Sequence, residues 1–172
     1  GEGNDLIVSI GEAQDTINGG AGNDIIFGGS DEDEGRGDTL MGGDGKDIFV
    51  YLPQGQIGRS GFEIPGLGDI ADNGDDTILD FMTGEDTIAL ISNGTAPFSL
   101  GKGTDFEDYS AAEAAAITAI GAVDGNTHVY FAYDVGGDGY LFIDDNADHT
   151  DDFSIKLAGL TNETDFDVKD ID

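Results

Sequence analysis

The chain is 172 residues long, enough for one domain or two small ones, and its 37 Asp and Glu against 6 Lys and Arg give a formal net charge of −31. So few basic residues cannot form the positive face that binds nucleic acid, and they disfavour an anionic membrane surface. The sequence has no cysteine, which excludes disulfides and thiolate metal sites, and no apolar run approaches the length of a membrane-spanning helix. Because such a charge opposes compaction, the composition predicts that cations are the natural partners of this chain.

A short repeated unit fills residues 1–50. In each copy an apolar side chain follows an aspartate by two positions. The glycine-rich part predicts a turn that reaches positive φ and directs carbonyl oxygens into one concavity, and the residues after the aspartate predict a three-residue strand. The chain begins part-way through this pattern and has no N-terminal signal peptide, so we expect it to be a piece of a longer protein. The copies are GEGNDLIV (1–8), GEAQDTIN (11–18), GGAGNDIIF (19–27), GRGDTLM (35–41) and GGDGKDIFV (42–50).

The spacing of the aspartates predicts two rows of loops. If each unit makes half a coil, the loops at Asp5, Asp24 and Asp47 line one edge, and those at Asp15 and Asp38 line the other. Stacked loops of this kind offer carbonyl and carboxylate oxygens, the ligands that Ca²⁺ prefers. Five inward apolar side chains are too few to order some fifty residues, so metal binding must supply folding free energy. The candidate metal-binding residues are Gly1, Gly3, Asp5, Asp15, Gly19, Gly20, Ala21, Gly22, Asp24, Gly28, Gly29, Asp38, Gly42, Gly43, Asp44, Gly45 and Asp47.

These units resemble the calcium-binding nonapeptide of RTX (repeats-in-toxin) proteins, G-G-x-G-x-D-x-U-x, in which U is apolar. GGAGNDIIF and GGDGKDIFV match this pattern in full, GEAQDTIN lacks two glycines, and Arg36 replaces a loop glycine. The resemblance implies an all-β chain in which a right-handed parallel β-roll over residues 1–51 binds several calcium ions. Residues 52–172 would form an antiparallel β-rich cap with one short helix.

The segment DTILDFMTGEDTIAL (76–90) carries two further D-T-I units, at Asp76 and Asp86. With GKDIFVY before it, the segment resembles the end of the β-roll in serralysin-type metalloproteases and other type I-secreted proteins. In that family the first aspartate of D-x-I-x-D-F helps to bind calcium, which implies a metal-binding role for Asp76.

The cap is expected to contain one helix and one hairpin. SAAEAAAITAIG (110–121) predicts a helix with a capping box of Ser110 and Glu113, ended by Gly121. Apolar and polar residues alternate in 126–146 on either side of GGDGY, which predicts a β-hairpin with GGDGY as its turn. The alternative is that GGDGY forms a calcium-binding loop.

The last thirty residues are strongly acidic. DDNADHTDD (144–152) fails the EF-hand pattern, because His149 replaces its glycine and Ile155 its glutamate, but it leaves open an accessory calcium site at Asp144, Asn146 and Asp148. Residues 152–172 predict two short strands and an acidic, hydrophobic tail. This tail resembles the uncleaved signal of type I secretion substrates, which is read by an ABC-transporter export complex.

No catalytic motif is present: the chain lacks H-E-x-x-H and G-x-S-x-G, and its many carboxylates cannot be assigned to pairs. We therefore expect this chain not to be an enzyme. The resemblance implies a monomeric, calcium-binding module of a larger bacterial protein that is secreted or displayed at the cell surface. The module would serve the export, folding and stability of the part that precedes it. That part is a secreted protease or lipase in one reading and a large adhesin in another, and a third reading has the module itself bind a ligand.

Overall fold

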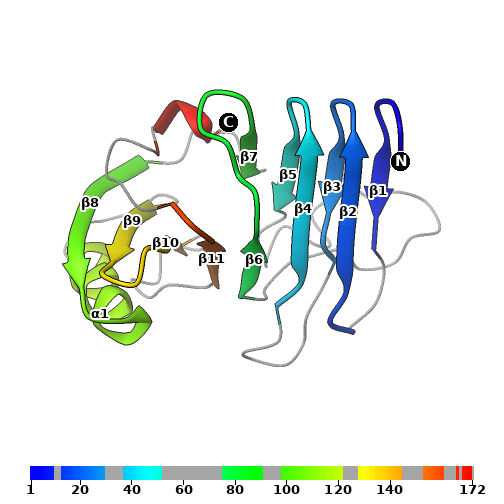
Figure 1. The fold of residues 1–172 in the computed structure, drawn as a ribbon. Helices are drawn as coiled ribbons and strands as arrows, with labels where there is room; N and C mark the ends of the chain where they lie inside the picture. The colour runs from blue at the N-terminus through cyan, green and yellow to red at the C-terminus, as the bar shows by residue number, and fades with distance from the viewer. Residues whose placement is uncertain are drawn as a thin grey trace, which may run out of the picture.

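A computed structural model describes residues 1–9, 13–29, 37–51, 75–90, 98–121, 128–144, 153–160, 166 and 168–171. In these residues the chain forms eleven β-strands in two sheets, one α-helix and one short 3₁₀ helix (Figure 1). None of the described helices is long and apolar enough to cross a membrane.

The N-terminal part is a parallel β-roll. One sheet contains β1 (Leu6–Val8), β3 (Ile25–Phe27), β5 (Ile48–Tyr51) and β7 (Thr87–Leu90), paired in parallel in that order. The second sheet begins with β2 (Thr16–Ala21), β4 (Thr39–Asp44) and β6 (Asp76–Ile78), which are also parallel. The chain therefore alternates between the two sheets with each unit, which confirms the mostly-β roll predicted from the repeat (Figure 1).

The apolar residue of each unit points into the roll. Strand register places Ile7, Ile26, Phe49 and Ile88 side by side in one sheet, and Ile17, Leu40 and Ile78 side by side in the other. All of them except the half-buried Ile7 are buried. Parallel stacking in register thus turns one apolar residue per unit into two continuous columns of core side chains.

The second sheet continues into the cap. Next to β6 lie β11 (Phe153–Leu157), β10 (Gly139–Asp144), β9 (His128–Asp134) and β8 (Phe98–Phe106). The β11–β10 and β10–β9 pairs are antiparallel as predicted, whereas β6–β11 and β8–β9 are parallel. Because β6 and β7 add a further coil, strand pairing crosses the boundary expected after residue 51, and the two-domain division stays a prediction.

The predicted helix is α1 (Tyr109–Ile120), but its cap is not the predicted one. Asp108 is the N-cap: its backbone is extended, and its carboxylate accepts the Ala111 N–H at 3.0 Å. The helix begins at Tyr109, so Ser110 lies inside the first turn, and the capping box of Ser110 and Glu113 is wrong. At the other end Gly121 donates its N–H to Ile117 O and closes the helix, as predicted.

The predicted hairpin is formed by β9 and β10. The Asp134 carboxylate holds its turn, because it accepts the Asp138 N–H at 3.0 Å and the Tyr140 hydroxyl at 2.8 Å. Of the accessory-site candidates, Asp144 is buried at the end of β10, while Asn146 and Asp148 lie outside the described residues.

The described residues of the C-terminal segment contain one of the two predicted strands. β11 is the first, residues Val168–Asp170 form a 3₁₀ helix (η1), and a second strand in residues 161–165 would lie outside the described residues. Ile171 makes a single parallel bridge with Ile88, which is too short a pairing to hold an extended strand.

Candidate calcium centre

We call the edge of the roll that carries the loops of Asp5, Asp24 and Asp47 the first edge, and the edge that carries those of Asp15 and Asp38 the second edge. The glycine-rich turns of the first edge lie directly on top of one another. Gly20 and Gly43 have φ of 108° and 99°, as the repeat predicts for these turns. A Cβ atom on Gly43 would collide with the carbonyl oxygen of Gly20, and one on Gly20 with that of Gly1. Gly45, Gly22 and Gly3 form a parallel column with the same close approach. Only glycine fits here, and its carbonyl oxygens lie between consecutive loops.

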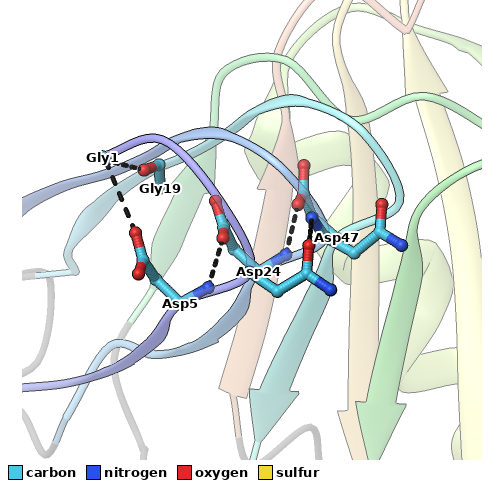
Figure 2. Close-up of polar contacts among 7 residues, drawn as sticks. Gly1, Asp5, Gly19, Asp24 and Asp47 are labelled. Carbon is cyan, nitrogen blue, oxygen red and sulfur yellow. Dashed lines mark hydrogen bonds and ion pairs between the residues drawn. The ribbon is translucent and has the colours of Figure 1, made fainter.

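The repeated spacing of the unit produces a ladder of aspartates along this edge, in which the backbone N–H of one aspartate donates to the carboxylate of the next. The Asp5 N–H donates to Asp24 Oδ1 at 2.8 Å, and the Asp24 N–H donates to Asp47 Oδ1 at 2.8 Å (Figure 2). The Asp47 N–H continues the ladder to Asp86 Oδ1 at 3.0 Å. These contacts bring the three predicted loops of the first edge together in the predicted order.

A second ladder lines the opposite edge. The Asp15 N–H donates to Asp38 Oδ1 at 2.7 Å, and the Asp38 N–H donates to Asp76 Oδ1 at 2.6 Å. Asp76, for which only the family resemblance implied a metal-binding role, therefore lies in line with the repeat aspartates.

The predicted site residues Gly28 and Gly29 lie directly after β3. Gly29 has a φ of 120° and approaches Ser9.

The second carboxylate oxygens of Asp24 and Asp47 differ from the first ones in lacking a hydrogen-bond donor among the described residues. Both residues are almost fully buried, at 0% and 1% exposed, and their Oδ2 atoms accept no hydrogen bond from the described part of the chain. Each Oδ2 faces the first glycine of its own loop, Gly19 or Gly42, so closely that a Cβ there would collide with it. A buried anionic oxygen without a donor is costly unless a cation neutralises it.

Backbone carbonyls complete the surroundings of these oxygens. A Cβ on Gly19 would meet both Asp24 Oδ2 and, at 2.7 Å, the carbonyl oxygen of Gly42 in the next loop. One loop earlier, the backbone nitrogen of Gly1 donates to Gly19 O and lies 3.7 Å from Asp5 Oδ2 (Figure 2). Carboxylate and carbonyl oxygens from two consecutive loops thus converge on the same region, which fits a hard, oxygen-loving cation such as Ca²⁺.

A metal ion bound at this edge would take most of its ligands from the backbone. Among the described residues no group of three or more His, Asp or Glu side chains could hold a metal ion, so carbonyl oxygens would have to supply most ligands. Some predicted loop carbonyls also join the loops to one another: Ala21 O accepts the Gly3 N–H at 2.6 Å, and Asp44 O accepts the Gly22 N–H at 2.8 Å.

Electrostatics at the end of the ladder also favours a cation. Burial raises the pKa of Asp47 above its usual 3.8, and the negative charges of Asp24 and Asp80 add to this effect. Burial likewise raises the pKa of Asp86, with repulsion from Asp47 and Asp80. The hydrogen bonds that these carboxylates accept act in the opposite direction and are outweighed. The charged forms are therefore disfavoured here by the protein alone.

Asp80 and Asp86 belong to the site but were not predicted to do so. The two carboxylate oxygens of Asp80 accept the Gly42 and Gly43 N–H groups at 3.0 Å each, where the next loop would otherwise stack. Asp86 ends the first ladder. Its D-T-I context was visible in the sequence, whereas no spacing rule pointed to Asp80.

An exposed asparagine ladder runs beside the aspartates. Asn4 Oδ1 accepts the Asn23 N–H at 2.9 Å, and Asn23 Oδ1 accepts the Lys46 N–H at 3.0 Å. These residues precede the aspartates of successive units, and they fix the register of the loops from the outside.

Comparison with known proteins identifies the repeated segment. Residues 11–35 and 34–50 match the family model of the RTX calcium-binding nonapeptide repeat, in four copies. This part of the chain therefore consists of RTX repeats, which bind calcium, and the resemblance inferred from the sequence is confirmed. No curated protein sequence matches the chain. The serralysin-like character of residues 76–90 stays a prediction.

Proposed function

We propose that this chain is a calcium-dependent folding module at the C-terminal side of a type I-secreted bacterial protein. The module leaves the cell unfolded through an ABC-transporter export complex and folds outside, where calcium fills its loops. The observation that carries this proposal is the pair of buried carboxylate oxygens, Asp24 Oδ2 and Asp47 Oδ2, that accept no hydrogen bond in the described chain.

The residues that would hold calcium are those of the first edge. Asp24 and Asp47 would supply carboxylate oxygens, and the stacked glycines would supply carbonyl oxygens from the loops on either side. Calcium supplies positive charge and flexible, oxygen-rich coordination at such a place. The protein supplies the alignment, because each ladder hydrogen bond fixes one carboxylate oxygen and leaves the other directed at its own turn.

Charge explains why folding would wait for export. With a formal net charge of −31, the chain repels itself, and burial raises the pKa of Asp47, which disfavours its charged form. Ligand binding to the folded state stabilises it in proportion to the logarithm of ligand concentration over Kd. Extracellular calcium-binding modules have Kd values of about 10⁻⁴–10⁻³ M, so calcium levels outside the cell fill such sites and cytosolic levels do not.

We further propose that the module performs no catalysis itself. Its role is to support the export, extracellular folding and stability of a preceding enzyme or adhesin region. The acidic composition and the RTX repeats both support placing the protein outside a bacterial cell.

A calcium titration followed by far-UV circular dichroism tests this proposal. The full chain in EGTA should lack most of its β-signal and gain it cooperatively as calcium rises into the millimolar range. Magnesium at the same ionic strength is the control, since it demands rigid octahedral geometry and should be far less effective. A chain that has its full β-signal in EGTA, or that responds equally to both ions, would contradict the proposal.

A further inference from the structure

The C-terminal segment packs into the junction between the last coil of the roll and the cap. Phe166 is 2% exposed, and its ring stacks on Phe131 of β9 with centroids 4.4 Å apart and planes 6° apart. The Phe166 ring also contacts Phe81, with centroids 6.0 Å apart. Phe81 directly follows Asp80, whose carboxylate accepts the Gly42 and Gly43 N–H groups of the last repeat loop. Phe166 thus connects the roll and the cap sheet through one aromatic cluster.

Asp170 fixes the same segment by polar contacts. It is 2% exposed, and its carboxylate accepts the Thr83 hydroxyl and, at 3.1 Å, the Gly84 N–H. Both donors belong to the turn 82–85 between β6 and β7. One residue later Ile171 bridges to Ile88, whose side chain belongs to the inner column of the roll.

The turn that receives Asp170 is also held by the first-edge ladder. Asp86 accepts the Asp47 N–H with Oδ1 at 3.0 Å and the Met82 N–H with Oδ2 at 2.8 Å. One carboxylate therefore ties the turn to the repeat loops, and a second ties it to the C-terminal segment. If the ladder is not formed, the Thr83 and Gly84 donors are not positioned, and the buried carboxylate of Asp170 loses these two hydrogen bonds.

We infer that the C-terminal segment is a latch that closes only on the folded last coil, so that calcium controls its exposure. This inference rests on the proposed function, because it takes calcium to be the ligand that orders the ladder. In the calcium-free chain the segment is a free linear peptide, available to an export apparatus. In the calcium-bound chain it is covered by Phe81, Phe131 and the turn 82–85, so folding withdraws the segment from recognition.

Hydrogen exchange of the full chain, read by mass spectrometry with saturating calcium and in EGTA, tests the latch. Peptides covering 166–171 and 19–27 should both be protected in calcium and both exchange rapidly in EGTA. Asp170→Ala removes the acceptor for two donors and should speed exchange of the tail in calcium by about tenfold or more, while residues 19–27 stay protected. Glu107→Ala, which removes the same charge from an exposed position before α1, should change neither peptide.

The outcomes separate the latch from the function on which it rests. Calcium protection of 19–27 with a tail that exchanges equally fast in both conditions would overturn the latch and leave the proposed function intact. Failure of calcium to protect 19–27 in the unsubstituted chain would overturn the proposed function itself. If Asp170→Ala does not fold, Thr83→Val removes one donor only. A tail that exchanges at the unsubstituted rate in that variant would also overturn the latch.

Discussion

The two edges of the β-roll carry the same aspartate ladder, but Asp24 and Asp47 on the first edge differ from Asp15 and Asp76 on the second in what surrounds their second carboxylate oxygens. On the first edge, Asp24 Oδ2 and Asp47 Oδ2 are buried without a donor in the described chain. On the second edge, Asp15 Oδ2 accepts the Ser9 hydroxyl, and Asp76 Oδ2 accepts the Tyr51 hydroxyl at 3.2 Å. Whether an outer oxygen has a donor therefore depends on the neighbours beside it, and we expect the two oxygens without a donor in the described chain to attract a cation.

The difference between the two edges is tested most strongly by replacing the carboxylates of one edge at a time. Asp24→Asn and Asp47→Asn keep an acceptor for the ladder hydrogen bond but remove the charge that a cation would neutralise. Each should raise the calcium concentration at the folding midpoint by roughly a hundredfold, equivalent to about 3 kcal/mol. Asp15→Asn on the second edge is the matched control and should shift the midpoint much less. Equal shifts on both edges would remove the distinction between them.

The stacking of first-edge loops is tested by Gly43→Ala against Gly159→Ala. Both glycines have positive φ, 99° and 77°, but a Cβ on Gly43 meets the Gly20 carbonyl, whereas a Cβ on Gly159 has nothing within 4 Å. Gly159→Ala should cost about 1–2 kcal/mol of unfolding free energy from the backbone alone. Gly43→Ala should cost roughly 3 kcal/mol or more, because the loops must separate. Denaturant titration in saturating calcium measures both, and equal losses would show that the close approach is unimportant.

Replacing Asp80, whose carboxylate accepts the Gly42 and Gly43 N–H groups, should reduce the free energy of unfolding by less than Gly43→Ala does. Asp80→Asn leaves one acceptor for two donors, the Gly42 and Gly43 N–H groups, and should cost about 1–3 kcal/mol. Hydrogen exchange should become faster at these two amides while the Asp5 and Asp24 amides are unchanged. Asp105→Asn is the control, since this exposed residue has a φ of 65°, which asparagine also adopts. Uniform acceleration along the ladder would contradict a local role for Asp80.

The pH dependence of the calcium-free chain should be the smallest of these effects. Burial raises the folded-state pKa of Asp47 and Asp86 above 3.8. Their protonated forms therefore stabilise the calcium-free fold fully below pH 3.8, and this contribution is lost as pH rises through the raised values. Circular dichroism in EGTA should show β-structure decreasing as the pH is raised toward neutrality, and less steeply in Asp47→Asn. A gain of structure with rising pH would contradict the sign.

Local spacing in the sequence was enough to predict the roll and its two rows of loops. An apolar residue two positions after each aspartate predicted the inner columns, and the half-coil period predicted which loops share an edge. These features repeat within nine or so residues, so they are readable from one chain. The helix at 109–120 was similarly visible, although the competition between Asp108 and Ser110 for its N-cap was decided by backbone conformation that spacing does not reveal.

The difference in hydrogen bonding between the edges could not be predicted. It depends on donors such as Ser9 and Tyr51, whose relation to Asp15 and Asp76 exists only after the coils are stacked. The roles of Asp80 and Asp170 are of the same kind: each carboxylate binds a turn 37 or more residues away in the chain. Long-range capping of this type leaves no periodic trace in a sequence.

The central claim, that cations lie between the stacked loops of the first edge, is tested most directly by crystallography with Tb³⁺ in place of Ca²⁺. Anomalous difference maps should show peaks beside Asp24 Oδ2 and Asp47 Oδ2, within about 2.3–2.6 Å of carboxylate and carbonyl oxygens of consecutive loops. Maps without peaks at these two positions, or with peaks only beside Asp15 on the second edge, would contradict the account.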